Sequence, residues 1–234
     1  MAHEIPPVTT GSIDLTWLRH VVGPDARTVL EVGANHGQHT QLLLAMFPKA
    51  TIHAFEPDAR ALEQFRRAVS DRRVELHEIA LGATNGRAEF HASGGMRPGA
   101  TPQEQALYPK GWDQSGSLKA PKSHLQAHPW CKFVRTVKVE VRTMDTWARK
   151  HGVTDVDFVW ADVQGAEGDM VRGGAETLAR TRYLYCEYSD TELYEGQPNL
   201  SALLDMLPGF EVMRRFPDDV LLRNVALTTP PPAR

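Results

Sequence analysis

The sequence predicts a single three-layer α/β domain built on a mostly parallel central sheet. The chain has 234 residues, of which 41% are hydrophobic and 24% are charged, which is enough apolar material for a sizeable core. Short apolar runs alternate with helical segments in the first third of the chain, and this βαβαβ order favours parallel strands with right-handed crossovers. The same alternation returns after residue 143 and brings the total to about seven main strands.

Apolar periodicity predicts three strands and three helices before residue 82. The strands are expected at residues 28–33, 51–55 and 74–81. Ser12 is expected to cap the first helix, which carries its apolar side from Ile13 to Val21. The second helix, residues 38–47, ends at Pro48, and the third, residues 57–69, has Pro57 in its first turn.

A long segment rich in Gly and Pro, residues 93–130, interrupts this alternation and predicts a binding loop or lid. Residues 87–91 before it and 134–142 after it alternate like exposed strands that pair with each other. The remaining helices are expected at 144–151, 167–179 and 200–207, and the remaining strands at 156–162, 183–188, 209–216 and 220–227. The expected organisation is an N-terminal arm and helix at 1–27, one domain at 28–227 with an insertion near 93–130, and a tail at 228–234.

Composition excludes several classes of protein. The 26 Lys and Arg against 29 Asp and Glu leave a formal net charge of −3, which argues against a dedicated polyanion binder. Cys131 and Cys186 lie far apart without metal-ligand spacing, so neither a disulfide scaffold nor a structural zinc site is favoured. No secretory signal pattern and no apolar stretch of membrane-spanning length is visible, which predicts a soluble cytoplasmic protein.

The segment after the first strand, residues 31–40, is the first candidate ligand site, because ligands of such sheets bind at the carboxyl ends of the strands. Gly33 allows a tight turn, and Gly37 allows close approach of the backbone to a ligand at the start of the next helix. Two glycines could also serve only to turn a strand into a helix. The G-x-x-x-G spacing differs from the dinucleotide fingerprint and therefore argues against NAD.

Two glutamates strengthen this interpretation. Glu56 follows the second strand about twenty residues beyond the glycine turn, where a carboxylate can accept hydrogen bonds from ribose hydroxyls. Glu31 lies within the otherwise apolar first strand. Since a buried carboxylate is costly unless it is paired, Glu31 is expected to meet a donor such as a ligand ammonium group or nearby amides.

Further acids end the later strands. Asp162 ends the fourth strand of the expected sheet and should point into the same cleft, and Glu187 stands near the end of the fifth. Pairing with Arg182 is the structural alternative for Glu187. Glu167 suits the first turn of the next helix, where an acid complements the helix dipole.

At this point the sequence resembles the FkbM-type methyltransferases, which use S-adenosylmethionine. The resemblance rests on short motifs in the family's order, which together run from about Thr28 to Phe210. These motifs are Glu31-Val-Gly-Ala-Asn-His-Gly-Gln-His-Thr40, Phe55-Glu56-Pro57, Ile79-Ala-Leu-Gly82, Asp162-Val-Gln-Gly-Ala-Glu167 with Gly173, Tyr185-Cys-Glu187, Leu193-Tyr-Glu-Gly-Gln197 and Leu207-Pro-Gly-Phe210. Many members carry Lys in the fourth strand and Glu after Asp-Val, where this chain has Trp160 and Gln164.

The resemblance implies a class I methyltransferase fold, which is Rossmann-like, with seven strands of which the last is antiparallel. It also implies O-methylation of a saccharide or small natural product. Gly33, Asn35 and Gly37 would then surround the methionine portion of the cofactor, Glu56 the ribose, and residues 78–80 the adenine. The full set of cofactor-binding residues implied is Glu31, Gly33, Asn35, His36, Gly37, Thr40, Glu56, Glu78, Ala80 and Asp162.

Methyl transfer to a hydroxyl requires alignment of the two substrates and removal of the hydroxyl proton. Asp162 is the first candidate for the base, with His36, His124 and Glu187 as further catalytic candidates. Alternatively, Asp162 and Glu187 hold a Mg²⁺ ion that lowers the pKa of the acceptor hydroxyl. The insertion is expected to build the acceptor site, because Trp112 and Trp130 stand there among polar residues. The structural alternative for each tryptophan is that it pins the loop to the core.

Two other functions remain open at the level of the sequence. The first is a nucleic-acid methyltransferase on the same fold, which the acidic net charge and the missing Asn-Pro-Pro-Tyr and Pro-Cys signatures disfavour. The second is a nucleoside-binding module or a dinucleotide-dependent oxidoreductase. The expected partner is a small-molecule or saccharide hydroxyl, without nucleic acid or membrane, and the oligomeric state is unknown.

Overall fold

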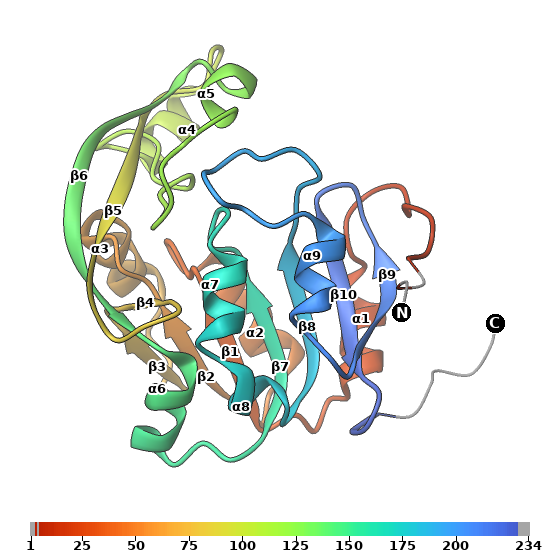
Figure 1. Cartoon of the computed structure of the whole chain (residues 1–234). Coiled ribbons are helices and arrows are strands. Elements are labelled where there is room, and N and C mark those ends of the chain that lie inside the picture. Colours follow the sequence, from red (N-terminus) through yellow and green to blue (C-terminus); the bar gives the residue numbers. More distant parts are fainter. Residues whose placement is uncertain (1–2, 4, 229–234) are drawn as a thin grey trace.

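The computed structural model describes residue 3 and residues 5–228 of the chain. Most of the expected tail at 228–234, together with residues 1, 2 and 4 of the expected arm, lies outside these residues. Within the described part, the strands of the main sheet are β1 (Thr28–Val32), β2 (Thr51–Phe55), β3 (Val74–His77), β7 (Val156–Ala161), β8 (Thr181–Glu187), β9 (Phe210–Arg215) and β10 (Asp219–Asn224). Their spatial order is β3-β2-β1-β7-β8-β10-β9 (Figure 1).

The directions of these strands confirm the fold class. Every pair from β3 through β8 is parallel, whereas β10 is antiparallel to both of its neighbours, β8 and β9. The order of the sheet reverses at β1, because the chain first builds outward to β3 and then returns to add β7 on the other side. Ligands of open α/β sheets bind at such a switch point, beyond the carboxyl ends of the strands.

Helices cover both faces of the sheet and complete three layers (Figure 1). One face packs against α1 (Leu15–Val22), α2 (Gln38–Met46) and α3 (Ala59–Ala68), and the other against α6 (Met144–His151), α7 (Glu167–Arg172), α8 (Ala175–Leu178) and α9 (Leu200–Asp205). The two largest apolar clusters lie in these two interfaces, one around Phe47 and Phe158 and the other around Phe55 and Met170. Among the described residues, no helix combines the length and the apolar character needed to cross a bilayer.

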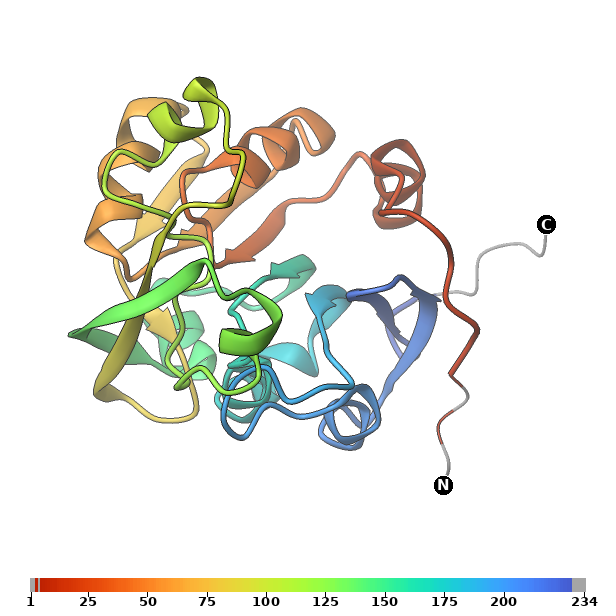
Figure 2. The same cartoon turned by 90° about the horizontal axis from the view of Figure 1, so that it is seen from above.

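A second sheet carries the insertion. Its strands are β4 (Ala80–Leu81), β6 (Cys131–Arg142) and β5 (Gly86–Gly95), in that order. The predicted pairing of residues 87–91 with 134–142 is confirmed, with Arg87 opposite Glu140 and His91 opposite Thr136. Between β5 and β6 the chain forms α4 (Pro102–Leu107) and α5 (His124–Ala127), and Figure 2 shows these segments on the side of the molecule away from the N-terminus.

Two predicted helix starts are wrong by a few residues. The first helix is capped by Asp14, whose Oδ1 accepts a hydrogen bond from the amide of Trp17 at 2.9 Å, and not by Ser12. The third helix begins at Ala59, after Asp58 accepts a hydrogen bond from the amide of Arg60. In both places an Asp close to the expected start caps the helix, since its carboxylate satisfies an otherwise free amide.

Two predicted elements are divided in the structure. Residues 74–81 leave the main sheet after His77, and Ala80 pairs instead with Val141 of the second sheet. The helix expected at 167–179 breaks into α7 and α8 at Gly173. A Cβ atom on Gly173 would lie 2.0 Å from the carbonyl oxygen of Gly82, so this break lets two backbone segments pack in direct contact.

Candidate functional site

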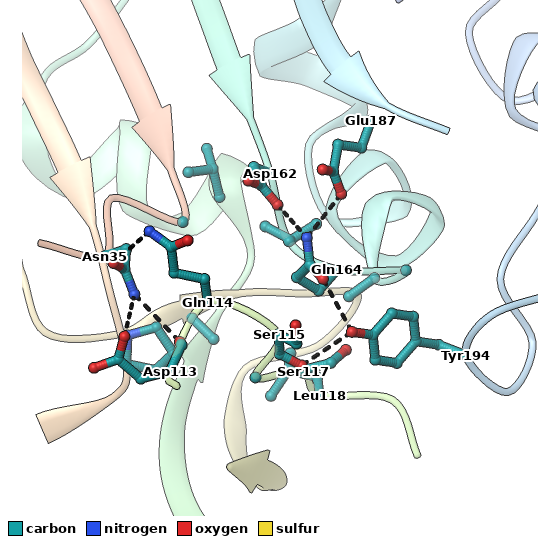
Figure 3. Close-up of a pocket in the computed structure, with 18 of the residues that line it drawn as sticks. Asn35, Asp113, Gln114, Ser115, Ser117, Leu118, Asp162, Gln164, Glu187 and Tyr194 are labelled. Carbon is teal, nitrogen blue, oxygen red and sulfur yellow. Dashed lines mark hydrogen bonds between the residues drawn. The ribbon is translucent and has the colours of Figure 1, made fainter. Parts of the chain in front are cut away.

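A cavity of about 630 Å³ opens beyond the carboxyl ends of the parallel strands, where the sheet order predicts a ligand site. The segments that follow β1, β2, β7 and β8 line it, and residues 112–118 of the insertion face them (Figure 3). Its size lies within the ~300–1,000 Å³ range of small-molecule sites. The ionisable and amide side chains that line it include Asn35, His39, Glu56, Asp113, Gln114, His124, Asp162, Gln164 and Glu187.

The turn after β1 brings backbone into the cavity. Gly33 has φ 91°, and a Cβ atom there would lie 1.8 Å from the carbonyl oxygen of Asp162. The ends of β1 and β7 therefore approach so closely that a side chain at residue 33 is excluded. Asn35 has φ 45° despite having a side chain, and it leads into α2 through Gly37. Because a left-handed backbone costs a non-glycine residue free energy, the contacts of Asn35 must hold it there.

Glu56, directly after β2, is held by that same turn. Its Oε2 accepts a hydrogen bond from the amide of Asn35 at 2.8 Å, and its Oε1 accepts one from the amide of Asp58 at 2.7 Å. Burial raises the pKa of Glu56 to about 8, although the two amide donors act in the opposite direction. This carboxyl group is thus fixed at the wall of the cavity with hydrogen-bonding capacity remaining.

Asp113 of the insertion links the loop to the turn after β1. The Asn35 amide group donates to the Asp113 carbonyl oxygen at 3.2 Å and to its Oδ1 at 3.3 Å (Figure 3). His36 Nε2 lies 2.9 Å from Asp113 Oδ2, and both side chains are buried. These contacts hold the insertion against the segment that the sequence assigns to the cofactor.

Asp162 and Glu187 end β7 and β8 and meet across one amide group. Gln164 Nε2 donates to Asp162 Oδ1 at 2.7 Å and to Glu187 Oε2 at 2.9 Å (Figure 3). The Tyr194 hydroxyl lies 2.9 Å from Gln164 Oε1 and 3.0 Å from the Ser115 carbonyl oxygen, and it can donate to either. Gln164 has φ 53°, so its backbone turns sharply to place this amide between the acids.

Burial raises the pKa of both acids in this pair. Glu187 is raised well above its ordinary value, first by desolvation and then by the nearby charges of Asp162 and Glu167. Hydrogen bonding between the two carboxyl groups raises the pKa of Glu187 further, whereas it lowers that of Asp162. The pair therefore holds a proton to a higher pH than two separate, solvated carboxyl groups would.

His39 lies at the same wall of the cavity, on the first turn of α2. Its ring packs against Trp160, with 4.7 Å between the ring centroids. Burial lowers the pKa of His39, while the charge of Asp162 acts in the opposite direction. A neutral imidazole close to Asp162 can accept a proton and be stabilised afterwards by that carboxylate.

His124, a predicted catalytic residue, lies at the opposite wall on α5. Its Nδ1 is buried without a hydrogen-bond partner among the described residues, and its ring lies 5.2 Å from that of Tyr194. Burial lowers the pKa of His124 to about 4, so its imidazole is neutral at pH 7. A buried nitrogen without a partner is costly, which suits a group that meets a polar ligand.

Several residues expected at the cofactor do not line the cavity. Glu31 is fully buried behind it, and its Oε2 accepts a hydrogen bond from the Thr40 hydroxyl at 2.5 Å. The donor expected for Glu31 is thus Thr40, where the sequence suggested an amide or a ligand ammonium group. His36 contacts Asp113, and Gly37 caps α2. Glu78 points outward to an ion pair with Arg66, whereas its neighbours Ile79 and Ala80 line the cavity.

Some residues of the cavity were missed by the sequence analysis. His39 stands within residues 31–40, and its position two residues after Gly37, in the first turn of the helix, is a signal that could have identified it. Asp113 and Gln114 belong to a long loop without periodicity, and only the folded chain brings them to Asn35. Glu167, expected in the first turn of a helix, does begin α7, and its Oε1 accepts from the amide of Val163 at 3.3 Å.

Comparisons with known proteins identify the family of the chain. A family model described as the methyltransferase FkbM domain matches residues 31–216. The 2-O-methyltransferase NoeI of Sinorhizobium fredii is 43% identical over 204 residues, which cover 85% of this chain and 80% of that protein. Methyltransferase 1 of Beauveria bassiana is 27% identical over 157 residues, covering 64% of this chain and 59% of the relative.

Solved structures were found at lower similarity. Fibrillarin of Aeropyrum pernix, with S-adenosyl-L-methionine natively bound, is 14% identical with a TM-score of 0.44, covering 89% of this chain and 71% of that one. An rRNA methylase of Streptococcus thermophilus is 13% identical with a TM-score of 0.45, and the match covers 90% of this chain and 93% of that one.

Proposed function

The chain belongs to the FkbM methyltransferase family, and from this premise we propose that it transfers a methyl group from S-adenosylmethionine to a hydroxyl of a saccharide or small natural product. The observation that carries the proposal is that the glycine turn, Glu56 and the Asp162–Glu187 pair open into one cavity. The domain proposed for this activity is residues 28–227, with the insertion as its acceptor-binding part. The relative NoeI is a 2-O-methyltransferase, which supports a hydroxyl acceptor.

The residues present fit S-adenosylmethionine. When bound, this cofactor supplies a methyl group on a positively charged sulfonium. The cavity wall carries the carboxyl groups of Glu56, Asp162 and Glu187, which offer oxygen acceptors to the polar groups of such a ligand. Glu56 would accept hydrogen bonds from ribose hydroxyls, and Gly33 keeps the adjacent turn free of a side chain.

Asp162 is proposed to accept the proton of the acceptor hydroxyl. Its pKa is raised by burial, and a base whose pKa lies nearer to the working pH is more effective. Glu187 and Gln164 orient it from one side, since the Gln164 amide holds both carboxyl groups in place. His39 is the alternative proton acceptor, in which case Asp162 would stabilise the imidazolium ion.

A Mg²⁺ site at Asp162 and Glu187 is the other role considered for this pair. Here the amide nitrogen of Gln164 donates to both carboxyl groups, so a cation would have to displace an existing hydrogen-bond donor. We therefore favour proton transfer for the pair. Equal methylation rates with Mg²⁺ and with a chelator are expected, and a rate restored specifically by Mg²⁺ would reverse this assignment.

The acceptor is proposed to bind between the carboxyl pair and the insertion. Trp112 and Trp130 line the cavity from the insertion, and their rings meet edge to face at 5.3 Å. The Trp112 indole nitrogen also donates to Ser115 Oγ at 3.0 Å, so this side chain both fixes the loop and forms the wall. Aromatic surface combined with polar groups suits a sugar or a hydroxylated ring.

Calorimetry with S-adenosylhomocysteine tests the cofactor, with NAD as the competing ligand. Binding of S-adenosylhomocysteine that is weakened by Glu56→Ala, but not by the exposed Glu89→Gln, supports the proposal. Preference for NAD would favour a dinucleotide-dependent enzyme instead. Transfer of labelled methyl to a panel of saccharides and natural products then tests the reaction, and label on nitrogen or on RNA would refute O-methylation of such acceptors.

A further inference from the structure

Away from the cavity, three potential metal ligands gather at the edge of the main sheet. His53 lies on β2, and Glu75 and His77 lie on the edge strand β3 (Figure 1). One ligand atom from each side chain lies within 4.8 Å of the other two. None of the three residues lines the cavity described above.

Strand register explains why these side chains meet. His53 pairs with Glu75, and Phe55 pairs with His77, in the parallel ladder between β2 and β3. Residues two apart on a strand point to the same face, so all three side chains project from one side of the sheet. Helix α6 covers this face, and its Trp147 ring contacts the His53 ring edge to face at 4.9 Å.

The distances suit tetrahedral coordination. His53 Nδ1 lies 3.4 Å from His77 Nε2 and 3.4 Å from Glu75 Oε2. A tetrahedral zinc ion with nitrogen and oxygen ligands at about 2.0–2.2 Å separates its ligand atoms by about 3.3–3.6 Å. Two of the three ligand-atom pairs thus have this spacing, and the third pair, Glu75 and His77, lies within 4.8 Å.

The chemistry of the three side chains also suits a metal. Imidazole nitrogens and a carboxylate oxygen are common ligands of transition-metal ions in proteins. Glu75 is half exposed and supplies a negative charge at an opening to solvent.

We propose that His53, Glu75 and His77 bind a divalent transition-metal ion of the zinc type. Two imidazoles and one carboxylate form a ligand set that zinc accepts, and such a set disfavours the all-oxygen ions Mg²⁺ and Ca²⁺. His151, at the end of α6, has its ring centroid 4.9 Å from that of His77 but does not belong to the group of close ligand atoms, so water would complete the coordination. The ion would tie the edge strand β3 to β2 just before residues 79–81, which line the cavity.

The test uses full-length protein without a histidine tag, stripped with a chelator and then titrated with Zn²⁺ by calorimetry. One equivalent of Zn²⁺ is expected to bind per chain. When Co²⁺ replaces Zn²⁺, the protein should show the visible absorption of a tetrahedral cobalt site. His77→Gln and Glu75→Gln should each weaken Zn²⁺ binding by at least about 10-fold, because even residues that only support ligands contribute that much. The exposed His20→Gln is the matched control and should bind as the unaltered protein does.

Thermal unfolding gives a second readout. At a free Zn²⁺ concentration of about 100 times the Kd, the Tm should rise by roughly 5–10 °C in the unaltered protein and in His20→Gln, but not in His77→Gln. If Zn²⁺ does not bind stoichiometrically, or if all variants bind Zn²⁺ equally well, the proposed metal site is refuted. S-adenosylhomocysteine binding by the stripped protein is measured separately, so failure of this site and failure of the proposed function are distinguishable.

Discussion

The carboxyl groups of Asp162 and Glu187 lie in one buried environment, yet the roles proposed for them in proton transfer differ. Hydrogen bonding between them raises the pKa of Glu187 and lowers that of Asp162. Burial makes the pair as a whole hold a proton more readily than an isolated carboxyl group would. Asp162 is the proposed proton acceptor, and Glu187 is proposed to orient it through the shared Gln164 amide.

Replacing Asp162 with Asn should remove the proton acceptor while preserving the shape of the side chain. We expect kcat for methyl transfer to fall by about 10²–10⁴-fold, the usual contribution of a positioned base. Affinity for S-adenosylhomocysteine should change far less, which calorimetry measures. His39→Gln is the comparison, and if it abolishes transfer while Asp162→Asn retains it, His39 is the proton acceptor.

Glu31 makes the stability of the protein depend on pH. Burial raises its pKa from 4.5 to about 8, and its Oε1 has no hydrogen-bond partner among the described residues. Because the folded-state pKa lies above the unfolded one, the stabilisation is complete below pH about 4.5 and is lost as pH rises to about 8. Glu31→Gln should therefore match the unaltered protein near pH 4.5 and be more stable at pH 8 by on the order of 4 kcal/mol. Denaturant unfolding at both pH values measures the free energy of unfolding of the two proteins. If they differ by the same amount at pH 4.5 and at pH 8, the raised pKa of Glu31 is contradicted.

How far the sequence predicts the site differs from residue to residue. Glu56, Asp162 and Glu187 were predictable because each ends a strand, and a parallel sheet brings such ends to one edge. Gln164 and Tyr194 lie thirty residues apart, and their hydrogen bond depends on how the loop after β8 folds back. Asp113 was unpredictable for the same reason, since no periodicity marks which loop residue reaches Asn35.

At the scale of elements, the turn between β1 and α2 is the most constrained segment of the site. Gly33 combines a left-handed backbone with a carbonyl oxygen 1.8 Å from where a Cβ atom would stand. Gly33→Ala must therefore separate β1 from β7, and we expect it to destabilise the fold by more than about 3 kcal/mol and to abolish cofactor binding. Gly152→Ala is the control, because Gly152 also has positive φ (68°) but has open space around it, and it should cost only about 1 kcal/mol.

Strand and helix alternation was predictable along most of the chain, whereas two internal breaks were not. The run at 74–81 is apolar enough for one strand, and the change of partner after His77 depends on β6, more than 50 residues later. Gly173 looks like an ordinary glycine near a helix end, and its contact with Gly82 is visible only in the folded chain. Local patterns thus predict the elements, while long-range pairing decides where they divide.

At the scale of the whole molecule, the insertion and the main sheet are joined across the cavity. Arg60 of α3 donates to the carbonyl oxygen of Ser93 at 2.8 Å, where the insertion begins. Asp113 contacts Asn35 and His36 farther along. Since Asn35 also donates its amide to Glu56, order in the insertion is linked to the position of the proposed ribose-binding carboxylate.

This link predicts that the insertion and cofactor binding stabilise each other. Asp113→Ala removes the carboxylate that His36 and Asn35 contact, and hydrogen bonds to a charged group contribute about 1.5–3 kcal/mol. Affinity for S-adenosylhomocysteine should fall by roughly 10–100-fold, and amide hydrogen exchange within residues 93–130 should become faster.

In the unaltered protein, S-adenosylhomocysteine should slow amide hydrogen exchange in that same segment, while α9 serves as an internal reference. The exposed Asp155→Ala should behave as the unaltered protein in both measurements. If Asp113→Ala weakens cofactor binding without changing exchange in the insertion, Asp113 acts only locally on the turn, and the two parts of the molecule are not energetically coupled.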